Sequence, residues 1–202
     1  GLAVALYGMG LAESVAGSYE SAESWLSESM TIAHETDNQR IYAFAMGVTG
    51  YGLIATGRIG EARKRAEQAR AIVEQIGHPH DRVSFIPIIV DAVRLEGDLD
   101  HASALLCESY QAIVEHPFRV VAVVGLAMQA ELWRSYGKLE KALRLYTFLL
   151  RDPTADHWAF MEMRRARLRN EMAVHYSETD IATIEARGRA MTWEEAIARA
   201  ED

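Results

Sequence analysis

One short pattern recurs along the chain with a fixed spacing. The pattern is Gly-x-apolar-x-x-Ala, and it occupies residues 17–22, 57–62, 97–102 and 137–142 of a chain of 202 residues. Each occurrence therefore begins 40 residues after the one before it. A period of this length is typical of proteins built from stacked repeats, in which every repeat is one supersecondary unit. We therefore interpret the chain as four equivalent repeats followed by a tail.

Each repeat contains two amphipathic stretches, and the repeated glycine stands between them. Glycine adopts the left-handed backbone conformation without a steric penalty, so it is suited to end one helix before the next begins. The chain has four prolines and no Asn-Gly or Asp-Gly pair, which favours helix over strand. We therefore predict an all-α fold. The expected helix pairs are 2–16 with 19–35, 39–56 with 59–76, 81–96 with 99–115, and 118–136 with 139–150.

Two columns of the repeat hold mostly small residues. Small side chains let two helix backbones approach each other closely, so both columns are expected at helix contacts. A charged side chain in either column would be buried between packed helices. The first column is Ala22, Ala62, Ala102 and Ala142, and the second, seven residues before each glycine, is Gly10, Gly50, Val90 and Ala130.

The segment after the fourth repeat predicts three further helices. Asp152 and Pro153 end the fourth helix pair, and Thr154 is a suitable N-cap for a helix over 155–175. Gly188 is expected to end a second, shorter helix. One face of the first of these helices carries residues spaced three or four apart, namely Trp158, Met161, Arg165, Leu168 and Met172.

The last expected helix, 193–200, opens with a capping box formed by Thr192 and Glu195. A terminal repeat exposes an apolar face unless another element covers it, so the three helices of the tail are expected to cap the array. The predicted organisation is a repeat region at 1–150 and capping helices at 151–202.

The repeat is similar to the tetratricopeptide repeat (TPR). The shared features are the small residue, the glycine seven positions later, the apolar residue two further on and the alanine five after the glycine. The usual TPR has 34 residues, so the additional residues here are expected to lengthen the helices. The resemblance implies an α-solenoid of four TPR-like helix-turn-helix repeats of 40 residues, followed by a helical cap.

A second resemblance concerns the larger protein. Long TPR-like repeats resemble those in the C-terminal halves of LuxR-type ATP-dependent transcription factors and of related multidomain ATPases or nucleotide cyclases. The stretch 185–200 also looks like the segment that closes the repeat region in those proteins. These resemblances imply a non-enzymatic interaction or sensor module of a larger bacterial signal-responsive transcriptional regulator. The alternative is a stand-alone scaffold that assembles other proteins.

The composition excludes several classes of protein. With 21 basic and 29 acidic residues the formal charge is −8, and an acidic surface repels nucleic-acid phosphates and anionic lipids. We therefore expect neither nucleic acid nor a membrane as a direct partner. The longest apolar run, 120–128, is far shorter than the about 20 residues of a membrane-spanning helix. Cys107 is the single cysteine, which fits a reducing cytoplasm, and its place beside Leu105 and Leu106 predicts a buried thiol.

Few residues carry a signal for catalysis or for a cofactor. His78, His80 and Asp81 are of metal-ligating types, with His101 further along, but no further ligand follows at a known spacing, so structural or solvated roles are favoured. Asp98 is interpreted as a helix N-cap rather than as an acid/base partner of His101. The chain also lacks a glycine-rich phosphate loop. We therefore predict no catalytic residues, no metal and no cofactor.

A group of arginines lies in the tail. Arg164, Arg165, Arg167 and Arg169 fan around the predicted helix instead of forming one stripe, and acidic neighbours dilute them. A solvated helix face is therefore favoured over a nucleic-acid-binding patch.

Five residues are candidates for partner binding, because in TPR-like arrays the first helix of each pair lines a concave groove. Tyr51, Asp91 and Glu131 each stand six residues before a repeated glycine, and Arg94 and Arg134 each stand three before it. Residues three apart on a helix are neighbours, so each acid can pair with the arginine that follows it. Alternatively, the arginines present their N–H groups to a carboxylate of a protein segment or effector, against which Tyr51 packs. The sequence leaves both interpretations open.

The first helix carries a signal for self-association. The chain begins at Gly1 without an initiator methionine, which suggests a fragment of a longer protein. A first repeat without a cap would expose the apolar side of its first helix, where Leu2, Leu6 and Met9 lie. A homodimer that forms through this end is therefore among the expected partners.

Overall fold

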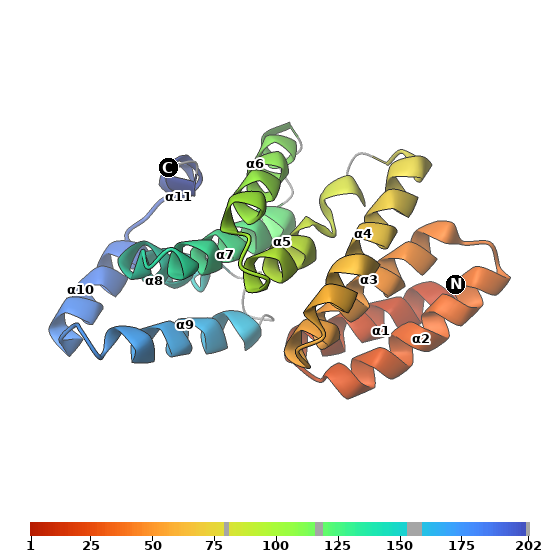
Figure 1. Cartoon of the computed structure of the whole chain (residues 1–202), viewed down its shortest axis with the longest axis horizontal. Coiled ribbons are helices and arrows are strands. Elements are labelled where there is room, and N and C mark those ends of the chain that lie inside the picture. The colour runs from red at the N-terminus through yellow and green to blue at the C-terminus, as the bar shows by residue number, and fades with distance from the viewer. Residues whose placement is uncertain (79–80, 116–118, 153–158, 201–202) are drawn as a thin grey trace. The chain divides into compact units, whose positions relative to one another are not determined.

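The computed structural model describes residues 1–78, 81–115, 119–152 and 159–200, and every regular element within them is a helix (Figure 1). The prediction of an all-α fold is therefore confirmed. The chain divides into two compact units, unit 1 at Gly1–Leu105 and unit 2 at Leu106–Asp202. The predicted division into repeats at 1–150 and a cap at 151–202 is based on the repeat pattern of the sequence, whereas the two units are defined by compactness. The predicted division therefore stays a prediction.

Unit 1 holds the first two helix pairs and most of the third. α2 packs against α1 and α3, and α4 packs against α3 and α5, so successive helices are neighbours in space. The elements are α1 (Leu2–Ala16), α2 (Tyr19–Glu35), α3 (Gln39–Ala55), α4 (Ile59–Ile76), the 3-10 turn η1 (Asp81–Val83) and α5 (Ile86–Leu95), and α6 (Leu99–Glu115) begins in unit 1.

The third repeat differs from the prediction of one helix over 81–96. The chain forms η1 first, and α5 begins only at Ile86. Pro87 lies in the first turn of α5, where its missing N–H costs no helical hydrogen bond. Pro87 also has no N–H to donate to the carbonyl of Val83, so one unbroken α-helix cannot continue from η1 through this position.

The repeated glycines end helices, as the sequence predicts. Gly17, Gly57, Gly97 and Gly137 have φ values of 84°, 77°, 93° and 73°, in the left-handed region that favours glycine. After each of them the chain enters the second helix of its pair within two residues. The 40-residue period therefore marks equivalent turns.

The alanine column lies at helix contacts. Ala22 is 3% exposed, and Ala62, Ala102 and Ala142 are fully buried. The glycines of the second column also allow close approach: a Cβ on Gly10 would lie 2.6 Å from Leu26 Cγ. Both predictions from the small columns are thus confirmed in the described repeats.

Unit 2 contains the fourth helix pair and the helices of the tail. α8 packs against α7, α9 and α10, and α11 packs against α7. Met161, Leu168 and Met172 are fully buried on one face of α9, as predicted. Thr154 and Trp158, also assigned to that helix, lie outside the described residues. The helices are α7 (Arg119–Ser135), α8 (Leu139–Leu149), α9 (Ala159–Met172), α10 (Glu178–Arg189) and α11 (Trp193–Ala200).

The predicted capping box at the start of α11 is confirmed. The Glu195 amide donates to Thr192 Oγ1 at 3.2 Å, and the Thr192 amide donates to Glu195 Oε2 at 3.1 Å. A second capping box, which the sequence analysis missed, joins Ser177 and Asp180 at the start of α10. Both boxes satisfy amide groups that a helix start leaves without intrahelical partners.

Gly188 does not end a helix, so that prediction is wrong. It lies within α10, where a Cβ would stand 2.5 Å from the carbonyl oxygen of Arg144 and 2.9 Å from Thr147 Cβ. The glycine is needed because the backbones of α10 and α8 approach closely here. This requirement comes from a contact far away in sequence and not from a turn.

Replacing Gly188 with alanine is expected to destabilise the protein by about 1–3 kcal/mol, because the backbone of α8 cannot yield as a flexible side chain can. Gly8→Ala is the control, since a Cβ on Gly8 meets nothing within 4 Å. That change should stabilise α1 by about 0.5–1 kcal/mol. Chemical denaturation measures both, and equal effects of the two changes would contradict the close contact between α8 and α10.

Candidate functional site

The five candidate residues lie on the first helices of repeats two, three and four. Tyr51 belongs to α3, Asp91 and Arg94 to α5, and Glu131 and Arg134 to α7. The half-buried ring of Tyr51 packs against a cluster formed by Ala22, Leu26, Ala45 and Val48. Tyr51 thus contributes to the apolar packing between α2 and α3.

Asp91 and Arg94 form the ion pair that their spacing predicts. The Arg94 Nη2 group donates to Asp91 Oδ1 at 2.6 Å, and the two residues are 8% and 4% exposed. A buried pair of charges is held more strictly than an exposed one, because separating the partners leaves an uncompensated charge away from water. The pair therefore fixes the side chain of Arg94 on α5.

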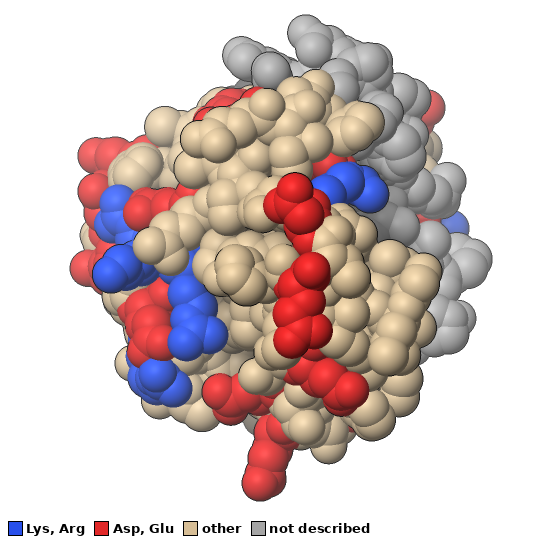
Figure 2. All heavy atoms as spheres, turned by 90° about the vertical axis from the view of Figure 1, so that its right-hand side faces the viewer, with Lys and Arg blue, Asp and Glu red and all other residues tan. Residues whose placement is uncertain are grey.

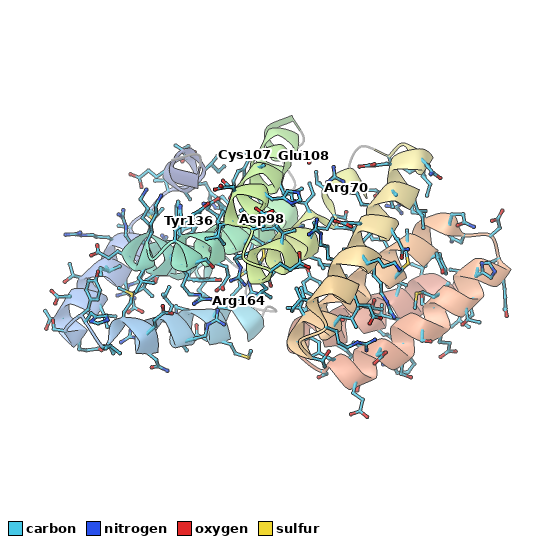
Figure 3. All side chains as sticks on the ribbon, viewed as in Figure 1. Arg70, Asp98, Cys107, Glu108, Tyr136 and Arg164 are labelled. Carbon is cyan, nitrogen blue, oxygen red and sulfur yellow. The ribbon has the colours of Figure 1, made fainter. Side chains whose placement is uncertain are left out.

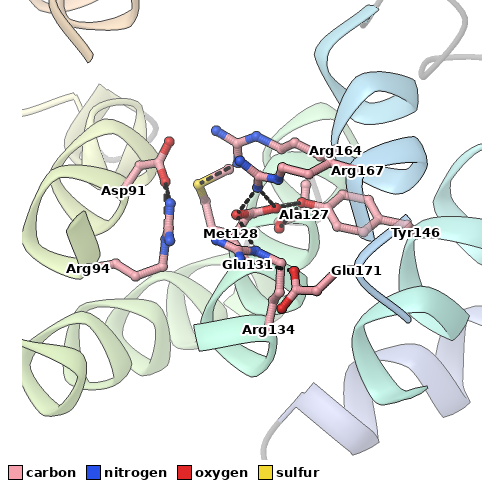
Figure 4. A network of polar contacts seen from close by, with 10 residues as sticks. All are labelled: Asp91, Arg94, Ala127, Met128, Glu131, Arg134, Tyr146, Arg164, Arg167 and Glu171. Atoms are coloured by element: carbon pink, nitrogen blue, oxygen red, sulfur yellow. Dashed lines mark hydrogen bonds and ion pairs between the residues drawn. The ribbon is translucent and has the colours of Figure 1, made fainter. Parts of the chain in front are cut away.

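Glu131 accepts hydrogen bonds from three helices, although its side chain is fully buried (Figure 4). The Arg134 Nε group donates to it at 3.3 Å, which is the predicted pair. The Tyr146 hydroxyl of α8 donates at 2.8 Å. Arg167 Nη2 of α9 donates to both carboxylate oxygens at 3.0 and 2.8 Å. A buried carboxylate is tolerated only with such partners, so Glu131 joins α7, α8 and α9.

Tyr146 was not among the candidates, because its spacing within α8 places it with apolar core residues. Burial raises the pKa of Tyr146 well above its ordinary value of 10.0. Arg164 acts in the opposite direction, and the carboxylate of Glu131 adds to the increase. The hydroxyl thus stays protonated and serves as a donor to Glu131.

The arginines of α9 connect helices, so the prediction of a solvated face is wrong for most of them. Arg165 and Arg169 donate to the two oxygens of Glu185 on α10 at 2.6 and 2.7 Å. Glu185 itself is only 4% exposed. Arg167, with a side chain 53% exposed, reaches Glu131 as described. The fan of positions around α9 lets its arginines contact several neighbouring helices at once.

The remaining sequence candidates have structural roles. Asp81 accepts a bidentate pair of hydrogen bonds from Arg40 at 2.6 and 2.8 Å. Asp98 caps α6, since its carboxylate accepts from the His101 amide at 3.1 Å, as predicted. Cys107 is exposed further along α6, which contradicts the prediction of a buried thiol (Figure 3). The buried face of α6 contains Ala102 and Leu106. Cys107 is the next residue after Leu106, so its side chain points away from that face.

The described parts of the chain contain no group of three or more His, Cys, Asp or Glu side chains arranged to hold a metal ion. His80 lies outside these parts. None of the described helices combines the length and the apolar character needed to span a bilayer.

The family comparison supports the repeat interpretation. A family model described as tetratricopeptide repeat matches residues 1–75, which cover the first two helix pairs almost completely. No curated protein and no solved structure matches the chain. Residues 1–75 therefore form a TPR-like region, and the predicted fold class, an all-helical TPR-like α-solenoid, is confirmed.

We expect the stability of the protein to fall as the pH rises above about 10, where tyrosines of the unfolded chain lose their protons. Stability falls, and does not rise, with pH because the pKa of Tyr146 is raised in the folded state, which keeps a proton that the unfolded state releases. Tyr146→Phe should lower stability near pH 7 by about 1.5–3 kcal/mol and make the alkaline decline shallower. Denaturation between pH 7 and pH 11 measures both effects, and parallel curves for the two proteins would contradict this role of Tyr146.

Proposed function

We propose that this chain is a non-catalytic protein-interaction module of a larger bacterial signal-responsive transcriptional regulator. The observation that carries the proposal is the TPR-like region at 1–75, because such repeats typically mediate contacts between proteins. The resemblance of residues 185–200 to a closing segment supports the regulator over a stand-alone scaffold. The single cysteine supports a cytoplasmic location.

In this proposal a protein segment or an effector is recognised along the first helices, at Tyr51, Asp91, Arg94, Glu131 and Arg134. What supports it is that acid–arginine pairs of the same spacing recur in repeats three and four. A guanidinium has five N–H donors in a planar fork that suits a carboxylate. Because Asp91 already holds Arg94, a carboxylate of the partner would bind by exchange with the internal one. Recognition is thereby coupled to opening of a buried ion pair, which is a suitable element for a sensor.

The test replaces Arg94 and Arg134 with alanine in the full-length protein. We expect the signal response to fall at least about tenfold, as for residues central to an interface. Loss of the arginines also leaves buried carboxylates without these partners, which can lower stability. A second variant, Asp91→Arg with Arg94→Asp, therefore exchanges the two charges: it keeps an internal ion pair but moves the guanidinium group to position 91. Arg70→Ala on α4 is the control, since Arg70 pairs with Glu74 of its own helix and is not one of the five residues. An intact response in the folded variants would exclude these residues as the recognition site.

Self-association is a separate part of the proposal. Leu2, Val4 and Met9 are 61%, 46% and 46% exposed on α1, whereas Leu6, also assigned to this surface, is buried at 4%. Leu2 and Met9 are seven residues apart and share one face of α1, whereas Val4 lies on another face. Exposed apolar side chains favour association with another protein surface. We expect sedimentation to show a dimer whose formation is weakened by Met9→Glu, and a monomer at high concentration would contradict this.

A further inference from the structure

Unit 1 contains a hollow that involves none of the five groove residues. It lies between α2 and α4, beside the C-terminal half of α3, and its volume is about 180 Å³. Sites for drug-sized molecules usually have about 300–1,000 Å³, so this hollow suits a smaller ligand. The residues that line it belong to the first and second repeats, within the TPR-like region.

The two walls of the hollow carry opposite charges. Glu20 and Glu23 of α2 line one wall, and both are exposed. Within the described parts of the chain neither has an ion-pair partner. All of residues 1–39 are free of Lys and Arg. On the face of the molecule that Figure 2 shows, acidic side chains also run in a line. The wall of α2 therefore favours a positive group.

The opposite wall belongs to α4 and is positive. Arg58 and Arg65 line it, and both donate to the one carboxylate of Glu61, at 3.0 and 2.8 Å. Arg65 also donates to the Thr49 hydroxyl at 3.2 Å, which holds its guanidinium against α3. Two guanidinium groups share a single carboxylate, so a net positive charge is left on this wall. It favours a negative group.

The floor between the walls is apolar. Tyr19, Ala22 and Leu26 of α2 and Leu53 of α3 line it, and Gly52 of α3 adds no side chain. A Cβ on Gly52 would lie in ordinary contact with Tyr19, 3.5 Å from its Cβ, so the glycine leaves room for about one methyl group beside this residue. A ligand with an apolar body is therefore suited to the floor.

We propose that this hollow binds a zwitterion of the α-amino-acid class with an apolar side chain. The ammonium group lies toward Glu20 and Glu23, the carboxylate accepts from Arg58 and Arg65, and the side chain covers the apolar floor. A ligand with only one charge would meet a repelling wall on the opposite side. The bound molecule links the first repeat to the second through α2 and α4. The site thereby gives a chemical identity to a small effector. It shares no residue with the five groove residues, although Tyr51 of the groove packs against Ala22 and Leu26, which line the hollow. Binding in the hollow is therefore independent of recognition in the groove.

The direct test is calorimetric titration of the full chain with leucine and phenylalanine. Two analogues of leucine complete the set: isocaproate lacks the ammonium group, and isoamylamine lacks the carboxylate. We expect saturable binding of an amino acid, weakened at least about tenfold in each analogue. Absence of binding for both amino acids, or binding of an analogue as tight as that of leucine, would overturn the proposal.

Variants locate the site on the protein. Glu20→Gln with Glu23→Gln, and separately Arg58→Gln, should each weaken leucine binding at least about tenfold. These side chains are exposed, so the variants are expected to stay folded, which a thermal melt checks. Glu28→Gln on α2 and Arg70→Gln on α4 are matched controls, because neither residue lines the hollow. Binding that is equally tight in the hollow variants and in the controls would place the ligand elsewhere and overturn the assignment. Since binding is measured directly, this outcome is separate from failure of the regulator proposal.

Discussion

Close approach of helix backbones at small residues is the constraint on which the repeats depend. A column of buried alanines recurs every 40 residues, from Ala22 to Ala142. A left-handed glycine precedes each of them by five residues and reverses the chain between the paired helices. The turn and the contact are set by the same short pattern, so each helix pair is specified locally. Larger side chains are confined to positions outside the alanine column.

These local features could be predicted from the sequence because their cause lies within a few residues. The conformation of Gly17 and its equivalents, the N-cap at Asp98 and the capping box at Thr192 each depend on a neighbour at most a few positions away. Gly188 was misjudged for the opposite reason. Its role is set by the carbonyl of Arg144 on another helix, and nothing beside it in the sequence indicates that contact.

In the candidate site, too, the local contacts could be predicted from the sequence and the contacts between distant residues could not. The pairs Asp91–Arg94 and Glu131–Arg134 were predictable from their spacing of three residues. The contacts of Glu131 with Tyr146 and Arg167 join residues 15 and 36 positions apart, and only the packing of α7, α8 and α9 brings them together. Similarly, the hollow between α2 and α4 has opposite walls that belong to different repeats. Its charge pattern becomes visible only once the first two repeats are stacked.

The repeat interpretation depends most directly on burial of the alanine column between closely packed helices. Ala102 is fully buried, and a glutamate in its place would bring an unpaired charge into that contact. The decisive measurement is the free energy of unfolding of Ala102→Glu. The account predicts a loss of about 3–5 kcal/mol, visible as a much lower melting temperature. An unchanged melting temperature would show that the column does not lie at a helix contact and would contradict the repeat interpretation.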